Sequence, residues 1–205
     1  MSGNLFIVSA PSGAGKTSLV HALLKHNPHI DLSVSYTSRP ARVGEIDGVH
    51  YHFVTREKFI EMQGHGEFLE SAEVYGNFYG TSQTWITQEI AKGREILLEI
   101  DWQGAQQVRK IFPKAINIFI LPPSLAALRQ RLTGRGTDHP DVIATRMAAA
   151  QVDVAHVAGC DYVIINDDLN HALQELNAVV LSAKLTCSKQ LARYQTLINQ
   201  LQKPE

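Results

Sequence analysis

The chain has 205 residues, of which 44% are hydrophobic and 19% charged, and its formal net charge is -1 at pH 7. This length suits one domain, or one core with insertions, and the composition excludes an intrinsically disordered chain. A near-neutral chain also lacks the positive charge that drives binding to nucleic acid, so local clusters of Lys and Arg would have to meet any anionic ligand.

The chain contains two cysteines, Cys160 and Cys187. They form no C-x-x-C pair, which argues against a disulfide framework or a zinc site and fits a reducing cytosol. The apolar run over residues 5–8 is too short for a signal peptide or a membrane span. We therefore expect a cytoplasmic protein that binds neither membranes nor nucleic acid.

The first predicted element is a buried strand over residues 5–10, LFIVSA, and a helix follows it up to a stop at HNP, residues 26–28. Between them lies SAPSGAGKTSL, residues 9–19. This segment fits the phosphate-binding pattern G-x-x-x-x-G-K-[ST], except that Ala10 occupies the first glycine position. A strand before the pattern and a helix after it are the context that such a loop requires. The alternative is a glycine-rich turn before an ordinary helix.

This loop predicts a binding site for the phosphates of Mg²⁺–ATP. The backbone N–H groups of residues 13–18 would point into a concavity at a helix N-terminus, where the helix dipole favours an anion. Lys16 could reach the β- and γ-phosphates, and the Thr17 hydroxyl could bind Mg²⁺. The predicted ATP ligands in the loop are Ser12, Gly13, Ala14, Gly15, Lys16, Thr17 and Ser18.

Residues 34–81 are polar, aromatic and punctuated by glycine, and their spacing is typical of β-hairpins. We expect a small β-rich insertion there. His50 and His52 alternate around Tyr51 and could form a metal pair. However, no third ligand is apparent, and both histidines would point away from Tyr51.

Three further apolar runs are candidate buried strands, at residues 95–101, 115–121 and 161–167. Helices are predicted between them, at residues 103–111, 124–133 and 140–157. Continuous apolar strands that alternate with helices predict a parallel sheet covered on both faces.

Asp101 closes the predicted strand 95–101. In an open parallel sheet, ligands bind at the carboxyl ends of the strands. We therefore expect Asp101 beside the phosphate-binding loop and its metal, with Glu99 on the same face. The alternative is an aspartate that caps the next helix.

The segment RLTGRGTDHPD, residues 131–141, is a break between two predicted helices, with Pro140 placed in a first helical turn. We expect a mobile lid over residues 125–154. From Leu169, apolar residues step by four and three and predict one long helix that packs on the core. The alternative is that its far end reaches a partner subunit in a homo-oligomer.

Six blocks of sequence carry a resemblance to a known family: SVSYTSRPARVGE, HYHF, FLESAEVYGNFYGTS, LEIDWQGAQQV, RLTGRGT and VIINDDL. In this order they resemble guanylate kinase, most of all the bacterial enzymes, over essentially the whole chain. The resemblance implies an α/β P-loop kinase fold, with a parallel β-sheet core flanked by helices, a small β-rich GMP-binding insertion and a helical lid. The implied regions are a nucleotide-binding core over 1–33, 82–124 and 155–205, a GMP-binding region over 34–81 and a lid over 125–154.

The reaction that the resemblance implies is in-line transfer of the γ-phosphoryl group of Mg²⁺–ATP to GMP, and by expectation dGMP, in purine nucleotide metabolism and GMP recycling. The products are ADP and GDP. No strong general base is needed, because a phosphate monoester is largely dianionic at pH 7. The alternatives are a catalytically silent guanylate-kinase-like binding module and a kinase for another monophosphate.

The resemblance also assigns residues to the acceptor. The GMP-phosphate ligands fall on Arg39, Arg42, Tyr51 and Tyr79, and the base site on Ser35, Glu70, Thr81 and Asp101. Glu70 would decide specificity, because its carboxylate accepts from the paired donors of guanine and would be left unpaired by adenine. Read in isolation, Glu70 would pass for a surface carboxylate and the two arginines for solvated loop charges.

On the lid side, the resemblance places Arg135 and Arg146 on the transferring phosphates, with Arg131 a weaker candidate, and Asn166 beside the adenine. The implied catalytic set is Lys16, Arg39, Asp101, Arg135 and Arg146.

Overall fold

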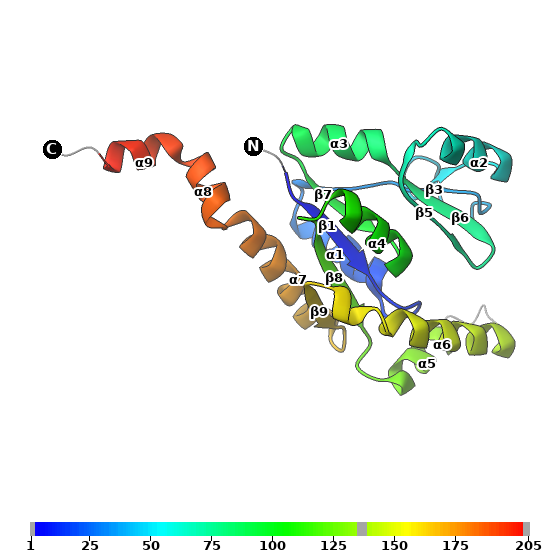
Figure 1. Cartoon of the computed structure of the whole chain (residues 1–205). Coiled ribbons are helices and arrows are strands. Elements are labelled where there is room, and N and C mark those ends of the chain that lie inside the picture. The colour runs from blue at the N-terminus through cyan, green and yellow to red at the C-terminus, as the bar shows by residue number, and fades with distance from the viewer. Residues whose placement is uncertain (1–2, 135–138, 203–205) are drawn as a thin grey trace.

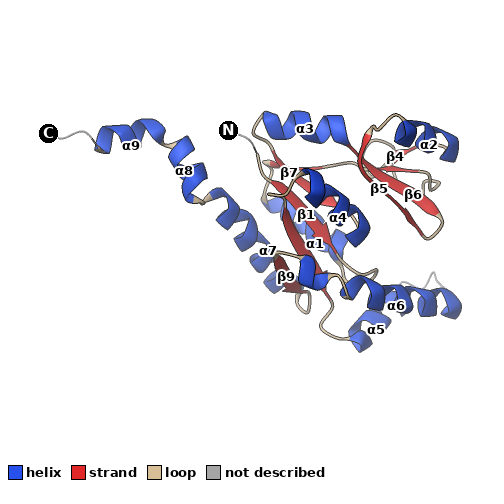
Figure 2. Ribbon diagram, viewed as in Figure 1, coloured by secondary structure: helices blue, strands red, loops and turns tan. Residues whose placement is uncertain are grey.

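The structure is a computed structural model, and it describes residues 3–134 and 139–202 (Figures 1 and 2). Its larger sheet has five strands in the order β2-β7-β1-β8-β9. The bounds are β1 (Leu5–Ser9), β2 (Ile30–Leu32), β7 (Glu95–Glu99), β8 (Ile116–Leu121) and β9 (Tyr162–Ile165). Every pair in this sheet is parallel, as predicted. Strand β2 was not predicted, because three residues are too few to show a pattern.

Helices cover both faces of this sheet, as Figure 1 shows. One face carries α1 (Lys16–His26) and α7 (Leu169–Lys184), and the other carries α3 (Gln83–Ala91) and α4 (Trp102–Ile111). The side chains of β1 alternate between the two layers. Phe6 and Val8 pack in the cluster of α1 and α7, whereas Leu5 and Ile7 pack in the cluster of α3 and α4. The core therefore has two apolar layers that hold the carboxyl end of β1 in place.

A second, smaller sheet lies beside this core, with strand order β4-β3-β6-β5. It consists of β3 (Tyr36–Thr37), β4 (His52–Phe53), β5 (Phe68–Val74) and β6 (Asn77–Ser82), with α2 (Arg56–Gly64) against it. Phe59 of α2 stacks on Phe68 at 4.5 Å between ring centroids. The β-rich insertion is thus confirmed. Helix α2 was not predicted, because only Phe59 and Met62 of its nine residues are buried and its apolar pattern is faint.

Two further helices are α5 (Leu125–Thr133) and α6 (Pro140–Val154), and a short 3₁₀ turn follows them at Val157–Gly159. The two helices pack through Leu128, Leu132 and Ala150. No helix within residues 3–134 and 139–202 combines the length and the hydropathy that a membrane span requires.

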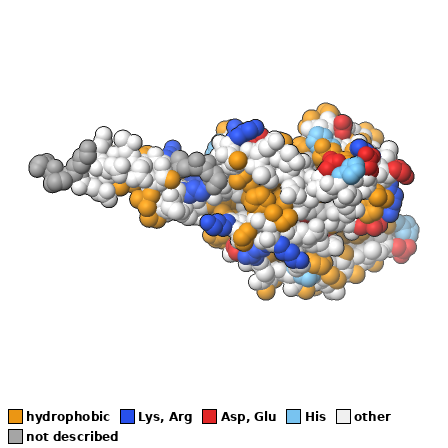
Figure 3. Space-filling view, turned by 45° about the horizontal axis from the view of Figure 1, so that its top comes forward, with side chains coloured by type: hydrophobic (Ala, Val, Ile, Leu, Met, Phe, Trp, Pro, Cys, Tyr) orange, Lys and Arg blue, Asp and Glu red, His pale blue; other side chains and the backbone are white. Residues whose placement is uncertain are grey.

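The prediction of one long C-terminal helix is wrong. The tail consists of α7, α8 (Cys187–Arg193) and α9 (Gln195–Leu201), with breaks after Lys184 and at Tyr194. The first break comes where contact with the core stops, because Ala183 is the last buried residue of the stripe. Thr186, a residue type that favours a cap over a helix interior, is the N-cap residue of α8. Beyond that point the tail projects away from the core (Figures 1 and 3).

Candidate active site

The predicted phosphate-binding loop joins β1 to α1 and lies at the carboxyl end of the sheet. Gly15 is the N-cap residue of α1, and its φ of 90° lies in the left-handed region that glycine adopts most readily. No side chain among the described residues caps this helix, so its first N–H groups remain available to an anion. The loop lines a cavity of about 420 Å³ together with Glu99 and Asp101. The structure therefore provides a concavity at the helix N-terminus where the sequence predicted one.

Lys16 and Thr17 extend from the loop toward the end of β7. Lys16 Nζ donates to the backbone oxygen of Ile100 at 3.0 Å, and the Thr17 hydroxyl donates to the Glu99 carboxylate. The hydroxyl and the carboxylates of Glu99 and Asp101 are oxygen donors, which Mg²⁺ prefers. No cluster of three or more acidic, His or Cys side chains in the described ranges could hold a metal. A Mg²⁺ ion here would thus need nucleotide phosphates among its ligands.

Asp101 caps a helix, which was the alternative that its sequence position suggested. It is the N-cap residue of α4, and its Oδ1 accepts from the backbone N–H of Gly104 at 2.9 Å. Asp101 also lines both the cavity at the loop and a neighbouring cavity of about 250 Å³. Capping and facing a ligand are therefore compatible at this position.

The neighbouring cavity gathers residues of the predicted acceptor site. Six of the eight line it, namely Ser35, Arg42, Tyr51, Glu70, Tyr79 and Asp101, and Arg146 of α6 joins them. The other two, Thr81 and Arg39, contact residues that line the cavity. The Thr81 hydroxyl donates to Glu70 Oε1 at 2.6 Å, and the Arg39 guanidinium lies 5.5 Å from the centroid of the Tyr51 ring. The tertiary structure thus brings the whole predicted acceptor set together.

Glu70 is a buried carboxylate, with 3% of its surface exposed. Burial raises the pKa of Glu70 to about 7, and the charge of Asp101 adds to this rise, while the Thr81 hydrogen bond and Lys16 oppose it. A ligand that donates hydrogen bonds to this buried carboxylate would stabilise its charged form. The reading of Glu70 as a surface carboxylate is therefore wrong.

We expect Glu70→Gln to stabilise the substrate-free protein at alkaline pH. The folded pKa of about 7 exceeds the ordinary value of 4.5, so between these pH values the folded state holds a proton that the unfolded chain has lost. Glu70 therefore lowers the free energy of unfolding as pH rises through this window, by up to about 3 kcal/mol. Urea unfolding at pH 4.5 and pH 8 measures this.

The stability gain of Glu70→Gln should appear at pH 8 and nearly vanish at pH 4.5. Glu67→Gln is the matched control, since Glu67 lies in the open just before the same strand. An equal gain at both pH values would contradict the linkage.

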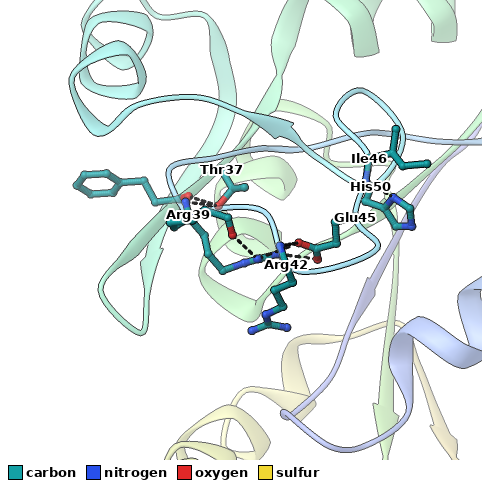
Figure 4. A network of polar contacts seen from close by, with 8 residues as sticks. Thr37, Arg39, Arg42, Glu45, Ile46 and His50 are labelled. Carbon is teal, nitrogen blue, oxygen red and sulfur yellow. Dashed lines mark hydrogen bonds and ion pairs between the residues drawn. The ribbon is translucent and has the colours of Figure 1, made fainter. Parts of the chain in front are cut away.

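Arg39 and Glu45 form an ion pair within the segment that joins β3 to β4 (Figure 4). Arg39 donates to both Glu45 oxygens, at 2.9 and 2.8 Å, and the backbone N–H of Arg42 donates to the same carboxylate at 2.7 Å. The hydrogen bonds from Arg39 lower the pKa of Glu45 to about 2. Figure 4 shows the guanidinium of Arg42 pointing away from this network. Glu45 was not among the predicted site residues, although it ends the block SVSYTSRPARVGE.

The lid-side predictions divide into three cases. Arg146 lines the 250 Å³ cavity. Asn166 is buried and its amide donates to the backbone oxygen of Ala14 at 2.8 Å, while Arg131 donates to the backbone oxygen of Asn166 at 2.8 Å. These two side chains brace the loop from behind. Arg135 lies outside the described residues.

A further acidic residue that the sequence analysis missed is Asp153. It lines the cavity at the loop, together with Trp102. Burial, together with the charge of Asp101, raises the pKa of Asp153 to about 6. Trp102 also stacks on His156 at 3.5 Å between centroids. Asp153 follows Arg146 by seven residues, so the helical period was the signal that could have found it.

A wider cavity of about 690 Å³ lies beside α8, near the amino ends of β1 and β8. Its walls include Leu5, Ile90 and Phe112, and none of the predicted site residues lines it. Ligand chemistry in this kind of sheet belongs to the carboxyl ends of the strands. We therefore place the active site at the two smaller cavities.

Comparisons with known proteins identify the family of the chain. A family model described as guanylate kinase matches residues 2–183. The chain is 57% identical over 201 residues to guanylate kinase of Methylobacillus flagellatus, which covers 98% of this chain and 100% of that relative. It is 59% identical over 201 residues to guanylate kinase of Thiobacillus denitrificans, covering 98% and 96%. The crystal structure of guanylate kinase from Anaplasma phagocytophilum matches with a TM-score of 0.77 and 31% identity, covering 94% of this chain and 96% of that chain.

Proposed function

The chain belongs to the guanylate kinase family and is an ATP:GMP phosphotransferase, and from this premise we propose how its residues divide the reaction. The observation that carries the proposal is that the loop cavity and the acceptor cavity share a wall, which includes Lys16 and Asp101. If one substrate bound in each cavity, their phosphates would lie next to each other at the Lys16 ammonium. Residues 34–81 are the GMP-binding region, 125–154 are the lid, and the remainder is the nucleotide-binding core.

On the donor side, the backbone N–H groups of residues 13–18 bind the ATP phosphates at the N-terminus of α1. Lys16 places a positive charge on the phosphates that react, and Arg146 and Arg135 approach from the lid. The Thr17 hydroxyl would hold Mg²⁺, with Glu99 and Asp101 nearby. When bound, the ion neutralises charge on the β- and γ-phosphates.

On the acceptor side, Arg42, Tyr51 and Tyr79 bind the GMP phosphate. Arg39 contacts this group, since its guanidinium lies 5.5 Å from the centroid of the Tyr51 ring. Glu70, with Ser35, Thr81 and Asp101, reads the base. Guanine offers N1–H and the N2 amino group as adjacent donors, whereas adenine would leave the buried carboxylate without a partner.

Phosphoryl transfer then depends on positioning the two substrates and on stabilising charge, and not on removing a proton from the acceptor. The GMP phosphate has a second pKa near ~6, so a nucleophilic dianion predominates at pH 7. The cationic side chains hold the attacking and departing oxygens in line and stabilise the charge of the transition state. Closure of the lid and of the GMP-binding region excludes water, which would otherwise accept the phosphoryl group.

The experiment that tests this function offers GMP, dGMP, AMP, UMP and CMP separately with Mg²⁺–ATP and measures ADP and nucleoside diphosphate. We expect GDP and dGDP to form and the other acceptors to react far more slowly. AMP as the best acceptor would contradict the base site. Tight GMP binding without transfer would identify a silent binding module instead.

We expect Glu45→Gln to weaken GMP binding. The substitution removes the charge that holds Arg39, and a hydrogen bond to a charged group contributes about 1.5–3 kcal/mol. KM for GMP should therefore rise about tenfold or more, with KM for ATP nearly unchanged. Initial rates over a range of GMP concentrations measure this. The matched control is Glu61→Gln, whose exposed partner is Lys58. A rise in KM for ATP alone would refute the role of Glu45.

We also propose that the tail joins copies of the chain into a homo-oligomer in the cytoplasm. Leu191, Tyr194, Leu197 and Leu201 are exposed on α8 and α9, and apolar side chains are visible on the tail in Figure 3. Helices of seven residues are too short to be stable without packing partners. Light scattering should give the mass of a multimer for a chain ending at Gln202 and the mass of a monomer for one ending at Lys184. The same number of subunits in both would contradict this.

A further inference from the structure

Gly104 lies in the first turn of α4, where glycine is a poor helix former. A Cβ atom built on Gly104 would lie 2.5 Å from Glu70 Oε2 and 3.0 Å from Glu70 Cδ. Ordinary contact between carbon and its neighbours begins near ~3.5 Å. A side chain at position 104 is therefore incompatible with Glu70 as the structure places it.

The Glu70 carboxylate, and not the helix, is the partner that would move in this contact, and it would leave a well-defined position. Glu70 is buried, its Oε1 accepts from Thr81, and β5 pairs with β6 in a register that sets Glu70 opposite Thr81. Helix α4 is anchored to the sheet by buried Ala105 and Val108. A side chain at position 104 would thus displace the Glu70 carboxylate rather than the helix.

Gly104 also touches the second acid of the base site. Its backbone N–H donates to Asp101 Oδ1 at 2.9 Å, and Gln103 Nε2 donates to Asp101 Oδ2 at 3.0 Å. Glu70 and Asp101 both line the 250 Å³ cavity. One residue therefore orients one carboxylate through its N–H and makes room for the other through its missing side chain.

From this geometry we propose that Gly104 is a positioning residue for guanine recognition, which sets the place of the Glu70 carboxylate relative to Asp101. The inference rests on the proposed role of Glu70 and adds a specificity-determining position to it. A carboxylate displaced by a fraction of an ångström no longer meets N1–H and the N2 amino group together. A misplacement of about 1 Å can cost a catalytic site about 10²-fold.

The test is Gly104→Ala, which keeps the backbone N–H and adds only the Cβ atom. We expect kcat/KM for GMP to fall about 10- to 100-fold, mainly through KM. KM for ATP and the slow rate with AMP should change less than about twofold, so the selectivity for GMP over AMP falls. The matched control is Gly64→Ala, because Gly64 ends helix α2 and a Cβ there meets nothing within 4 Å.

A double-mutant cycle separates this role from a merely structural one. Glu70→Ala removes the atoms that would clash, so Gly104→Ala should cost less than about twofold in that background. An equal loss in both backgrounds, or no loss in the Gly104→Ala single variant while Glu70→Ala lowers kcat/KM for GMP, would overturn the inference. If Glu70→Ala itself left GMP turnover unchanged, the proposed base site would fail as well. Calorimetric titration with GMP reports the Kd of the folded fraction, so partial unfolding does not mask the result.

Discussion

Lys16→Ala is expected to lower kcat/KM for GMP by about 10³-fold, the size of effect that a preorganised charge has in phosphoryl transfer. The Lys16 ammonium lies on the wall that both cavities share, held by the backbone oxygen of Ile100 at 3.0 Å. Removing it leaves the charge that develops between donor and acceptor without its nearest cation. The measurement is the initial rate of GDP formation at saturating Mg²⁺–ATP.

The loss should be catalytic rather than structural. Lys16 makes one hydrogen bond of ordinary length, so thermal unfolding of Lys16→Ala should stay close to that of the unaltered protein. Lys25→Ala is the matched control, since Lys25 is exposed at the far end of the same helix. A loss of less than tenfold in Lys16→Ala would remove Lys16 from the catalytic set.

Glu70→Gln is expected to lower the preference for GMP over AMP by about 10³-fold or more, because a site built to pair with a substrate's donors discriminates by about 10⁴–10⁵. A glutamine presents one acceptor and one donor, so it no longer matches two adjacent donors of guanine. The measurement is the ratio of kcat/KM for the two acceptors. The same variant is the one expected to unfold at higher urea at pH 8.

Higher stability together with lower selectivity would distinguish a loss of recognition from a loss of folding. A variant that is more stable but less selective has lost function through recognition and not through folding, as is common where active sites hold strained or desolvated groups. Glu67→Gln should change neither property. An unchanged ratio in Glu70→Gln would mean that Ser35, Thr81 and Asp101 read the base without Glu70.

Much of the donor side could be predicted from the sequence, because its determinants are local. The loop needs glycine at Gly15, a lysine and a hydroxyl in consecutive positions, and a strand and a helix around them, all within about twenty residues. The parallel sheet followed in the same way from apolar runs alternating with helices. The acceptor residues came from the match of whole blocks, since neither Arg39 nor Glu70 carries a signal when read alone.

Other features depended on contacts that no local pattern contains. Strand β2 exists because Ile30 and its two neighbours pair with β7, and the tail breaks after Lys184 because the core ends there.

The sequence by itself determined which chemical groups the protein has and the local conformations that present them, since both depend on residue type and short spacing. Only the tertiary structure decided which groups meet. Lys16 contacts a residue 84 positions away, and Glu70 lies against Gly104. Such distances in space follow from how two sheets and their helices pack, and packing is a property of the whole chain.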